Sequence, residues 1–270
     1  MSEVIACANQ KGGVGKTTTV INLAAYLALL GKRVLVIDLD PQGNATSGLG
    51  LDRTASTGSI YPALLGNASA RDLAQQTQIE NLWMVPSGAD LAGAEIELIT
   101  LGQRERRLQQ ALLEVRDDFD FILLDCPPAV GLLTVNALTA ADGVLVPIQC
   151  EYYALEGLSQ LLSTINLVRD NLNPRLQLAG VLLTMFDART TLSADVAAEV
   201  RRHLGASVFD SVVPRSVRLA EAPSYGRPIA RYSPESRGAH AYQALAAEVM
   251  DRYPQGGSAP SARHEQAVGA

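Results

Sequence analysis

Residues 9–18 read NQKGGVGKTT and carry two lysines, one on each side of the glycines. The stretch follows a short apolar segment, VIACAN at residues 4–9, and precedes a segment with helical spacing of apolar residues, 17–30. A glycine-rich loop between a strand and a helix is typical of a phosphate-binding loop. Such a loop needs one lysine, Lys16. Lys11 therefore requires a separate explanation, in a chain with only three lysines against nineteen arginines.

The residue types of this loop suit phosphate. Glycines at positions 12, 13 and 15 let successive backbone N–H groups converge on phosphate oxygens, where a Cβ would obstruct them. The dipole of a helix that begins near Lys16 adds positive potential at the same point. Lys16 is expected to reach the outer phosphates, and the Thr17 hydroxyl to bind Mg²⁺ directly. The alternative, a glycine-rich turn that precedes a helix by chance, is disfavoured by the complete pattern.

Short apolar runs alternate with helix-period segments along the chain. The runs are too uniformly apolar to face water on either side, which is typical of parallel strands covered on both faces. The sequence therefore predicts an α/β fold: a mostly parallel central β-sheet with helices on both faces. The expected strands are VIACAN, RVLVID, LWMVPSG, FDFILLD, GVLVPIQ and LAGVLLTMF, and the expected helices are residues 17–30, 101–116, 132–140, 155–169 and 193–203.

Three aspartates stand at the ends of predicted strands. FDFILLD ends at Asp125, which places an acid at the carboxyl edge of the sheet, where nucleotides bind in such folds. Asp125 is expected to hold Mg²⁺ through water. Asp38 and Asp40 are two residues apart at the end of an extended run, so both are expected to project to the same side. Loop capping is the alternative for either residue. Two acids followed by Pro-Gln-Gly favour a functional role.

Composition excludes several classes of protein. With 270 residues and 47% hydrophobic content, one large domain is expected, over residues 1–253. The longest apolar runs are of strand length, so no membrane span is expected, and the first residues lack the features of a signal peptide. A cytosolic location follows. The three cysteines, Cys7, Cys126 and Cys150, have no CxxC spacing and are expected to be buried and reduced.

Two segments differ from the alternating pattern. Residues 52–78 are polar and rich in small residues, and loops with short helices are expected there. Residues 254–270, PQGGSAPSARHEQAVGA, lack apolar periodicity, so a disordered C-terminal tail is expected.

Charge is unevenly distributed along the chain. The net charge of −6 disfavours nucleic-acid binding through bulk charge. Between residues 185 and 237, however, eight arginines stand against six acids, whereas the rest of the chain has 14 basic and 22 acidic residues. A few arginines on one face can hold DNA phosphates without base contacts. A solvated basic face is the alternative. The eight are Arg189, Arg201, Arg202, Arg215, Arg218, Arg227, Arg231 and Arg237.

Five motifs together resemble one family. KGGVGKTT (11–18), DLDPQGNATSGLG (38–50), LLDCPP (123–128), QCEYYALEGL (149–158) and VRLAEAPS (217–224) are similar to the ParA/Soj family of chromosome and plasmid partition ATPases. This family belongs to the deviant Walker A (MinD/ParA) class of P-loop NTPases. The similarity runs over residues 4–253, and the combination of motifs is specific, whereas KGGVGKT alone marks the wider class.

The resemblance implies ATP and Mg²⁺ as ligands and a role for Lys11. In this class ATP drives two subunits into a face-to-face homodimer with both nucleotides sandwiched, and the first lysine of the loop crosses to the partner's phosphates. Lys11 matches that lysine, and Gly12 lies where the two loops approach most closely. Asp40 matches the residue that orients the attacking water, and Asp38 the one near the metal. The implied nucleotide-binding residues are Lys11, Gly12, Gly13, Val14, Gly15, Lys16, Thr17, Thr18, Pro214, Arg215 and Ser216, of which the last three match the segment that packs on adenine.

The resemblance also implies partners. Soj-like proteins place nonspecific double-stranded DNA contacts in the stretches that match DARTT (187–191) and PRSVRL (214–219). Arg189 and Arg218 are therefore the first candidates for DNA contact, followed by Arg201 and Arg202. Slow hydrolysis of ATP, stimulated by a ParB-like centromere-binding protein, and association with the nucleoid are further implications.

Other functions stay open at the level of sequence. A membrane-bound ATPase of the MinD type needs an amphipathic C-terminal helix, and residues 254–270 contain no Leu, Phe, Ile or Trp. An iron–sulfur relative needs paired cysteines that bridge a dimer, and their spacing is missing. A nucleotide-gated DNA scaffold in which hydrolysis is incidental is the remaining alternative, and Asp40 argues against it.

Overall fold

The computed structural model describes residues 2–52, 58–151 and 154–254, with side chains described except at 154–156. Eight strands form one sheet in the order β3-β4-β2-β5-β1-β6-β7-β8. All neighbours pair in parallel except β3 and β4, which are antiparallel. This confirms the predicted fold class. The strands are β1 (Glu3–Cys7), β2 (Val34–Asp38), β3 (Gln75–Gln76), β4 (Leu82–Val85), β5 (Phe121–Asp125), β6 (Gly143–Gln149), β7 (Gln177–Phe186) and β8 (Val208–Pro214).

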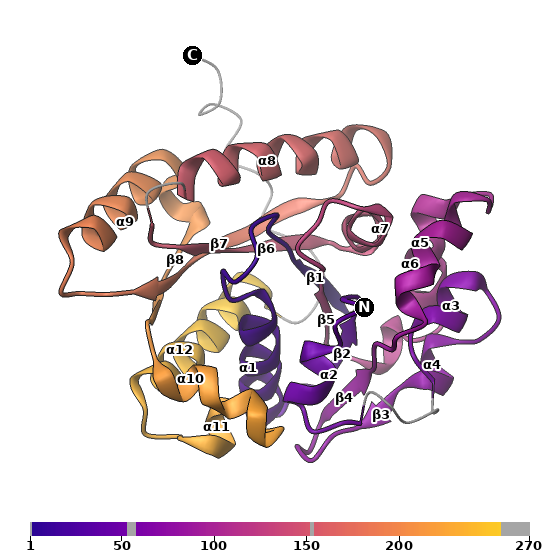
Figure 1. Cartoon of the computed structure of the whole chain (residues 1–270), viewed down its shortest axis with the longest axis horizontal. Helices are drawn as coiled ribbons and strands as arrows, with labels where there is room; N and C mark the ends of the chain where they lie inside the picture. Colours follow the sequence, from indigo (N-terminus) through magenta and orange to yellow (C-terminus); the bar gives the residue numbers. More distant parts are fainter. Residues whose placement is uncertain (1, 53–57, 152–153, 255–270) are drawn as a thin grey trace.

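Helices cover both faces of the sheet (Figure 1). One apolar cluster joins the sheet to α3 and α5–α9, and a second joins it to α1, α2 and α10–α12. The helices are α1 (Lys16–Leu29), α2 (Asn44–Gly48), α3 (Tyr61–Leu65), α4 (Ala70–Leu73), α5 (Leu91–Ile99), α6 (Arg107–Leu112), α7 (Leu132–Ala140), α8 (Ala154–Asn171), α9 (Thr191–Leu204), α10 (Val217–Glu221), α11 (Ile229–Tyr232) and α12 (Arg237–Arg252).

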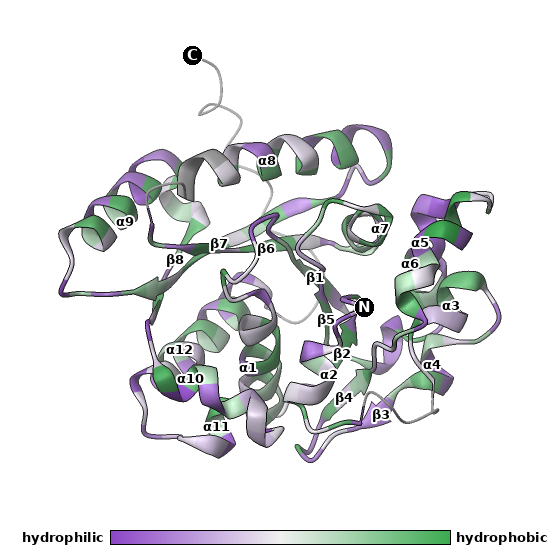
Figure 2. Cartoon of the chain, in the orientation of Figure 1, coloured by the Kyte–Doolittle hydropathy of each residue, from purple (hydrophilic) through white to green (hydrophobic). Residues whose placement is uncertain are grey.

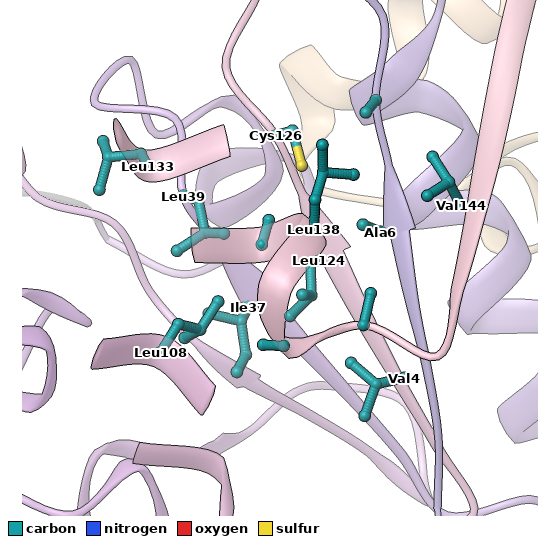
Figure 3. Packing of buried hydrophobic residues seen from close by; sticks show 14 of the residues in the cluster. Val4, Ala6, Ile37, Leu39, Leu108, Leu124, Cys126, Leu133, Leu138 and Val144 are labelled. Carbon is teal, nitrogen blue, oxygen red and sulfur yellow. The ribbon is translucent and has the colours of Figure 1, made fainter. Parts of the chain in front are cut away.

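The two clusters explain why the strands are apolar throughout. Side chains alternate between the faces of a strand. In β1, Val4 and Ala6 enter the first cluster while Ile5 and Cys7 enter the second. Figure 2 shows the central strands as predominantly hydrophobic, and Figure 3 shows Val4 and Ala6 within the first cluster. Burial on both faces leaves only the edges of the sheet for polar chemistry.

Several predicted elements change in extent. The helix expected over residues 101–116 is found only in part: the structure has a short 3₁₀ turn at Arg104–Arg106, then α6, then another turn at Arg116–Asp118. Gly102 and Gln103, the latter with φ of 53°, interrupt the helical path before it. The structure also adds elements that the sequence pattern did not predict, among them α2, α5, β8, α10, α11 and α12.

The two atypical segments are described in part. Within 52–78, the described residues form α3, α4 and the two-residue β3, which agrees with the expected loops and short helices. Residues 53–57, and the predicted tail from residue 255 onward, lie outside the described part of the chain. All three cysteines are buried and unpaired. Among the described residues, no helix combines the length and apolar character needed to cross a membrane.

One carboxyl group lies half-buried at the amino edge of the sheet. Glu3 begins β1, close to Asp142 and Arg116. Burial raises the pKa of Glu3 to about 7; the Asp142 carboxylate adds to the rise and Arg116 opposes it. A raised carboxyl pKa means that folding favours the neutral form. The contribution to stability is therefore complete below the unfolded pKa, near 4.5, and is lost as the pH rises through about 7.

Replacing Glu3 with glutamine should remove this pH-dependent loss. At pH 8 we expect Glu3→Gln to be more stable than the wild-type chain by roughly 1–2 kcal/mol, a value reduced from full linkage because Glu3 is partly exposed. The advantage should vanish near pH 4. Urea unfolding at both pH values measures it, with the exposed Glu80→Gln as the matched control. An advantage of equal size at both pH values would contradict the assignment.

Candidate functional site

The loop between β1 and α1 has the conformation that phosphate binding requires. Gly13 and Gly15 have φ of 73° and 93°, in the left-handed region that favours glycine. A Cβ added at Gly12 or Gly13 would meet no atom within 4 Å, so the outer side of the loop is open. Helix α1 begins directly after Gly15, which has no side chain to cap it. Its first N–H groups are therefore available to an anion.

Lys16 lies over this loop. Its side chain is buried, and Nζ donates a hydrogen bond of 3.2 Å to the Lys11 carbonyl. The loop is held from β7 as well, because Thr184 Oγ1 donates to the Val14 carbonyl at 2.8 Å. Asn9 accepts a hydrogen bond from the Lys11 backbone N–H at 3.0 Å. The loop is thus fixed before any ligand arrives, which lowers the entropy cost of binding.

Two of the predicted aspartates lie side by side beneath the loop. Strands β2 and β5 are neighbours, and their register pairs Asp38 with Asp125. Asp38 is fully buried and accepts hydrogen bonds from the backbone N–H and Oγ1 of Thr46 at 2.9 and 2.8 Å. A third donor is the Asp40 backbone N–H, at 3.1 Å. Burial raises the pKa of Asp38 to about 6, although these donors oppose the rise.

The Asp125 carboxylate has fewer hydrogen-bond partners than that of Asp38. Both carboxylate oxygens are buried, and neither has a hydrogen-bond partner among the described residues. Burial and the neighbouring Asp38 carboxylate raise the pKa of Asp125 well above its usual range, while Thr17 and Lys16 oppose the rise. Burying an unpaired carboxylate is costly. A cation beside Asp125 would offset that cost.

The donor groups of this site suit Mg²⁺. In the described part of the chain, no three carboxylate, histidine or cysteine side chains converge as a closed metal cage. Mg²⁺ is usually bound by one or two carboxylates together with waters and substrate phosphates, not by an all-protein cage. Asp125, Asp38 and the Thr17 hydroxyl beside an open phosphate loop match that mode.

Asp40 follows Asp38 in the loop between β2 and α2. It is almost buried, and its Oδ1 accepts the Gln42 backbone N–H at 3.0 Å. Its carbonyl accepts the Gly43 N–H at 2.8 Å. Asp40 therefore does cap the loop in part, as the alternative interpretation of the sequence expected. One oxygen, Oδ2, is left for a further partner, since no described residue is recorded in contact with it.

Lys11 points away from the loop that it begins. Its Nζ lies 3.4 Å from Glu151 Oε2, and the side chain is 45% exposed. In the part of the chain that the structure describes, no other side chain pairs with it. Glu151 follows β6 and also faces Arg215 at 3.6 Å. Glu151 lies in the motif QCEYYALEGL, but its contact with Lys11 was not predicted from the sequence. The available signal is its position two residues after the end of β6, at the carboxyl edge of the sheet.

The segment expected on adenine lies at the end of β8. The Arg215 N–H donates to the Phe186 carbonyl at 3.0 Å, and Pro214 is the last residue of the strand. Ser216 is the N-cap of α10, where its hydroxyl accepts the Leu219 N–H. That hydroxyl is already used within the chain, which leaves the backbone and ring of this segment for contact with a base.

The four candidate arginines for DNA contact are all paired with acids. Arg189 bonds to Asp187 at 2.7 Å, Arg218 to Glu221 at 3.1 Å, and Arg202 to Glu199. Arg201 is less exposed and donates to the carbonyls of residues 209 and 210, so it holds the β8 strand to α9. The structure does not bring these arginines together with the phosphate loop.

Known proteins with similar sequences include chromosome-partitioning proteins. Residues 2–178 match the family described as an AAA domain. The sporulation initiation inhibitor protein Soj of Bacillus subtilis is 55% identical over 92% of this chain and 98% of its own length. Chromosome partitioning protein ParA of Myxococcus xanthus is 52% identical over 93% and 89%.

Solved structures extend the comparison to the fold. A Mycobacterium smegmatis protein named cobyrinic acid a,c-diamide synthase, solved with ADP and magnesium, is 40% identical with a TM-score of 0.83, and the alignment covers 96% of this chain and 98% of that one. The cell division ATPase MinD of Pyrococcus furiosus is 26% identical with a TM-score of 0.76, over 93% and 99%. With relatives above 50% identity along nearly its whole length, the chain belongs to the ParA/Soj family of chromosome-partitioning ATPases.

Proposed function

We propose that this protein is an ATP- and Mg²⁺-dependent DNA partitioning ATPase. ATP binding forms a homodimer with both nucleotides sandwiched, and the dimer binds double-stranded DNA without sequence specificity. Hydrolysis is slow and is stimulated by a ParB-like centromere-binding partner. The protein acts in the cytoplasm on the nucleoid. The Mycobacterium smegmatis structure carries the name of another reaction, but the partition relatives share more identity with this chain.

The main support for the proposal is that the two lysines of the phosphate loop lie in different environments. Lys16 is buried over the loop, whereas the Lys11 side chain is exposed and, among the described residues, contacts only Glu151. One lysine suffices for a nucleotide in one subunit. An exposed lysine on the open side of the loop is available to a second subunit.

Each group of site residues has a separate role in ATP hydrolysis. The loop N–H groups and Lys16 bind and orient the phosphates, and residues 214–216 hold the adenine. Asp38, Asp125 and Thr17 would hold Mg²⁺, which would supply neutralising charge at the outer phosphates. Asp40 accepts a hydrogen bond from the attacking water and orients it in line with the γ-phosphate. Lys11 of the partner subunit completes the stabilisation of charge.

DNA binding depends on the dimer in this proposal. Arg189 and Arg218, with Arg201 and Arg202 as weaker candidates, would face phosphates on a surface doubled by the two-fold axis. Each must exchange its carboxylate partner for a phosphate, so single contacts are weak and two subunits are needed. The alternative function is a nucleotide-gated DNA scaffold in which hydrolysis is incidental. In that case, DNA and the ParB-like partner would not change the rate of ATP hydrolysis.

Asp40→Ala should bind ATP and accumulate as a dimer. Without the residue that orients water, ATP hydrolysis should fall by at least about 100-fold. Phosphate release and sedimentation with ATP and Mg²⁺ measure the two properties. Asp40→Asn is the matched control for structure, because it can still accept the Gln42 N–H. Hydrolysis at the wild-type rate in Asp40→Ala would remove Asp40 from the mechanism.

Lys11→Ala should retain ATP binding but lose ATP-dependent dimerisation and hydrolysis. Truncating one partner of a buried intersubunit charge pair weakens association by roughly 2–5 kcal/mol. Sedimentation velocity with ATP measures the dimer, and fluorescent ATP titration measures binding.

Two further variants sharpen this experiment. Lys32→Ala removes the third lysine, outside the loop, and should dimerise normally. Gly12→Val should block the dimer while sparing ATP binding, since a side chain there meets open space within one subunit. Dimerisation of Lys11→Ala at wild-type strength would reduce Lys11 to a solvated loop residue.

A further inference from the structure

A small cavity lies between α11 and the loop that precedes β4. Its volume is about 210 Å³, and it is bordered by Arg227 and Arg231 on one side and Gln78 on the other. Buried Leu49 and Ile79 line its interior. Drug-sized ligands and cofactors usually occupy about 300–1,000 Å³, so this cavity suits a smaller group.

The two arginines differ from the four candidates described above. Arg227 and Arg231 are exposed, and among the described residues neither guanidinium is recorded in an ion pair or a hydrogen bond. Arg189 and Arg218, by contrast, each face a carboxylate. An unpaired arginine loses no ion pair when it binds an anion, and its planar donors fit phosphate oxygens.

The segment that contains α10 and α11 is cationic. Residues 214–240 contain five arginines and two glutamates. Helices α10 and α11 are held together, because the Tyr232 hydroxyl donates at 3.0 Å to the same Glu221 oxygen that Arg218 contacts at 3.1 Å. The rings of Tyr232 and Tyr225 also stack at 4.9 Å. Helices α10 and α11 lie side by side in Figure 1, so Arg218 on α10 and the cavity beside α11 belong to one connected unit.

We propose that this cavity receives a backbone phosphate of DNA, bound by Arg227 and Arg231. The inference rests on the DNA binding proposed above and extends its surface from α10 to α11. A polyanion that passes over Arg218 meets this second site on the same unit, whereas an isolated anion would gain nothing from the other arginines. DNA is therefore favoured over free phosphate as the source of the ligand.

The test is the double variant Arg227→Gln/Arg231→Gln. Binding to duplex DNA of random sequence is measured with ATP and Mg²⁺ over a range of KCl concentrations. One lost phosphate contact in each subunit of the dimer should reduce the slope of log K against log[KCl] by about 2. Affinity at low salt should fall by about tenfold or more. Arg169→Gln/Arg175→Gln removes two exposed arginines on the opposite face of the sheet and should change neither quantity by as much.

A second pair of variants leaves both arginines in place. Gln78→Glu puts a carboxylate on the border of the cavity and should weaken DNA binding, whereas Gln78→Ala should not. This pair decides the question if the double arginine variant is unstable on heating. Inorganic phosphate, titrated into the nucleotide-free wild-type chain and the double variant, tests the alternative source.

These experiments distinguish a failure of the proposed phosphate site from a failure of the proposed function. Unchanged DNA affinity and salt slope in both Arg227→Gln/Arg231→Gln and Gln78→Glu would overturn this inference alone. Loss of inorganic phosphate binding with DNA binding intact would overturn DNA as the source. Absence of ATP-dependent DNA binding in the wild-type chain would overturn the proposed function together with the inference.

Discussion

Two carboxylates buried side by side constrain everything else in this site. The parallel register of β2 and β5 brings Asp38 and Asp125 together, and Asp125 has no hydrogen-bond partner in the described part of the chain. Like charges in a buried position repel, and the pKa of both groups is raised. The fold retains this costly arrangement directly beneath a phosphate loop and a buried lysine. A nucleotide with its cation is the ligand that would offset the cost.

In the proposed dimer, Lys11 connects this site to the second subunit. In one subunit it contacts Glu151, which also faces Arg215 in the segment proposed to hold adenine. Exposed ion pairs of this kind contribute little to stability. Lys11 can therefore exchange Glu151 for a partner's phosphate at small cost, and the proposed dimer depends on that exchange. In this proposal, residues 9–18 both bind the nucleotide, through Lys16, and join the subunits, through Lys11.

Much of this was predictable from sequence because its causes are local. Glycines with positive φ, Lys16 at the start of a helix and apolar strands that end in aspartate are visible in short windows. The helix over 101–116 was predicted too long, because apolar spacing continued past Gln103, where the left-handed backbone cannot be helical. Glu151 was missed since its contact with Lys11 spans 140 residues. The cavity at Arg227 needs the distant loop at Gln78. Both depend on tertiary packing, which no local pattern encodes.

The central claim is that Lys11 leaves its own subunit when the dimer forms. A crystal structure of Asp40→Ala with ATP and Mg²⁺ measures this directly through the position of Lys11 Nζ. Our account predicts a sandwich dimer in which Nζ has moved away from Glu151 and lies within hydrogen-bonding distance of the partner subunit's nucleotide phosphates. A dimer in which Lys11 still contacts Glu151 of its own chain, with no contact across the interface, would contradict the account.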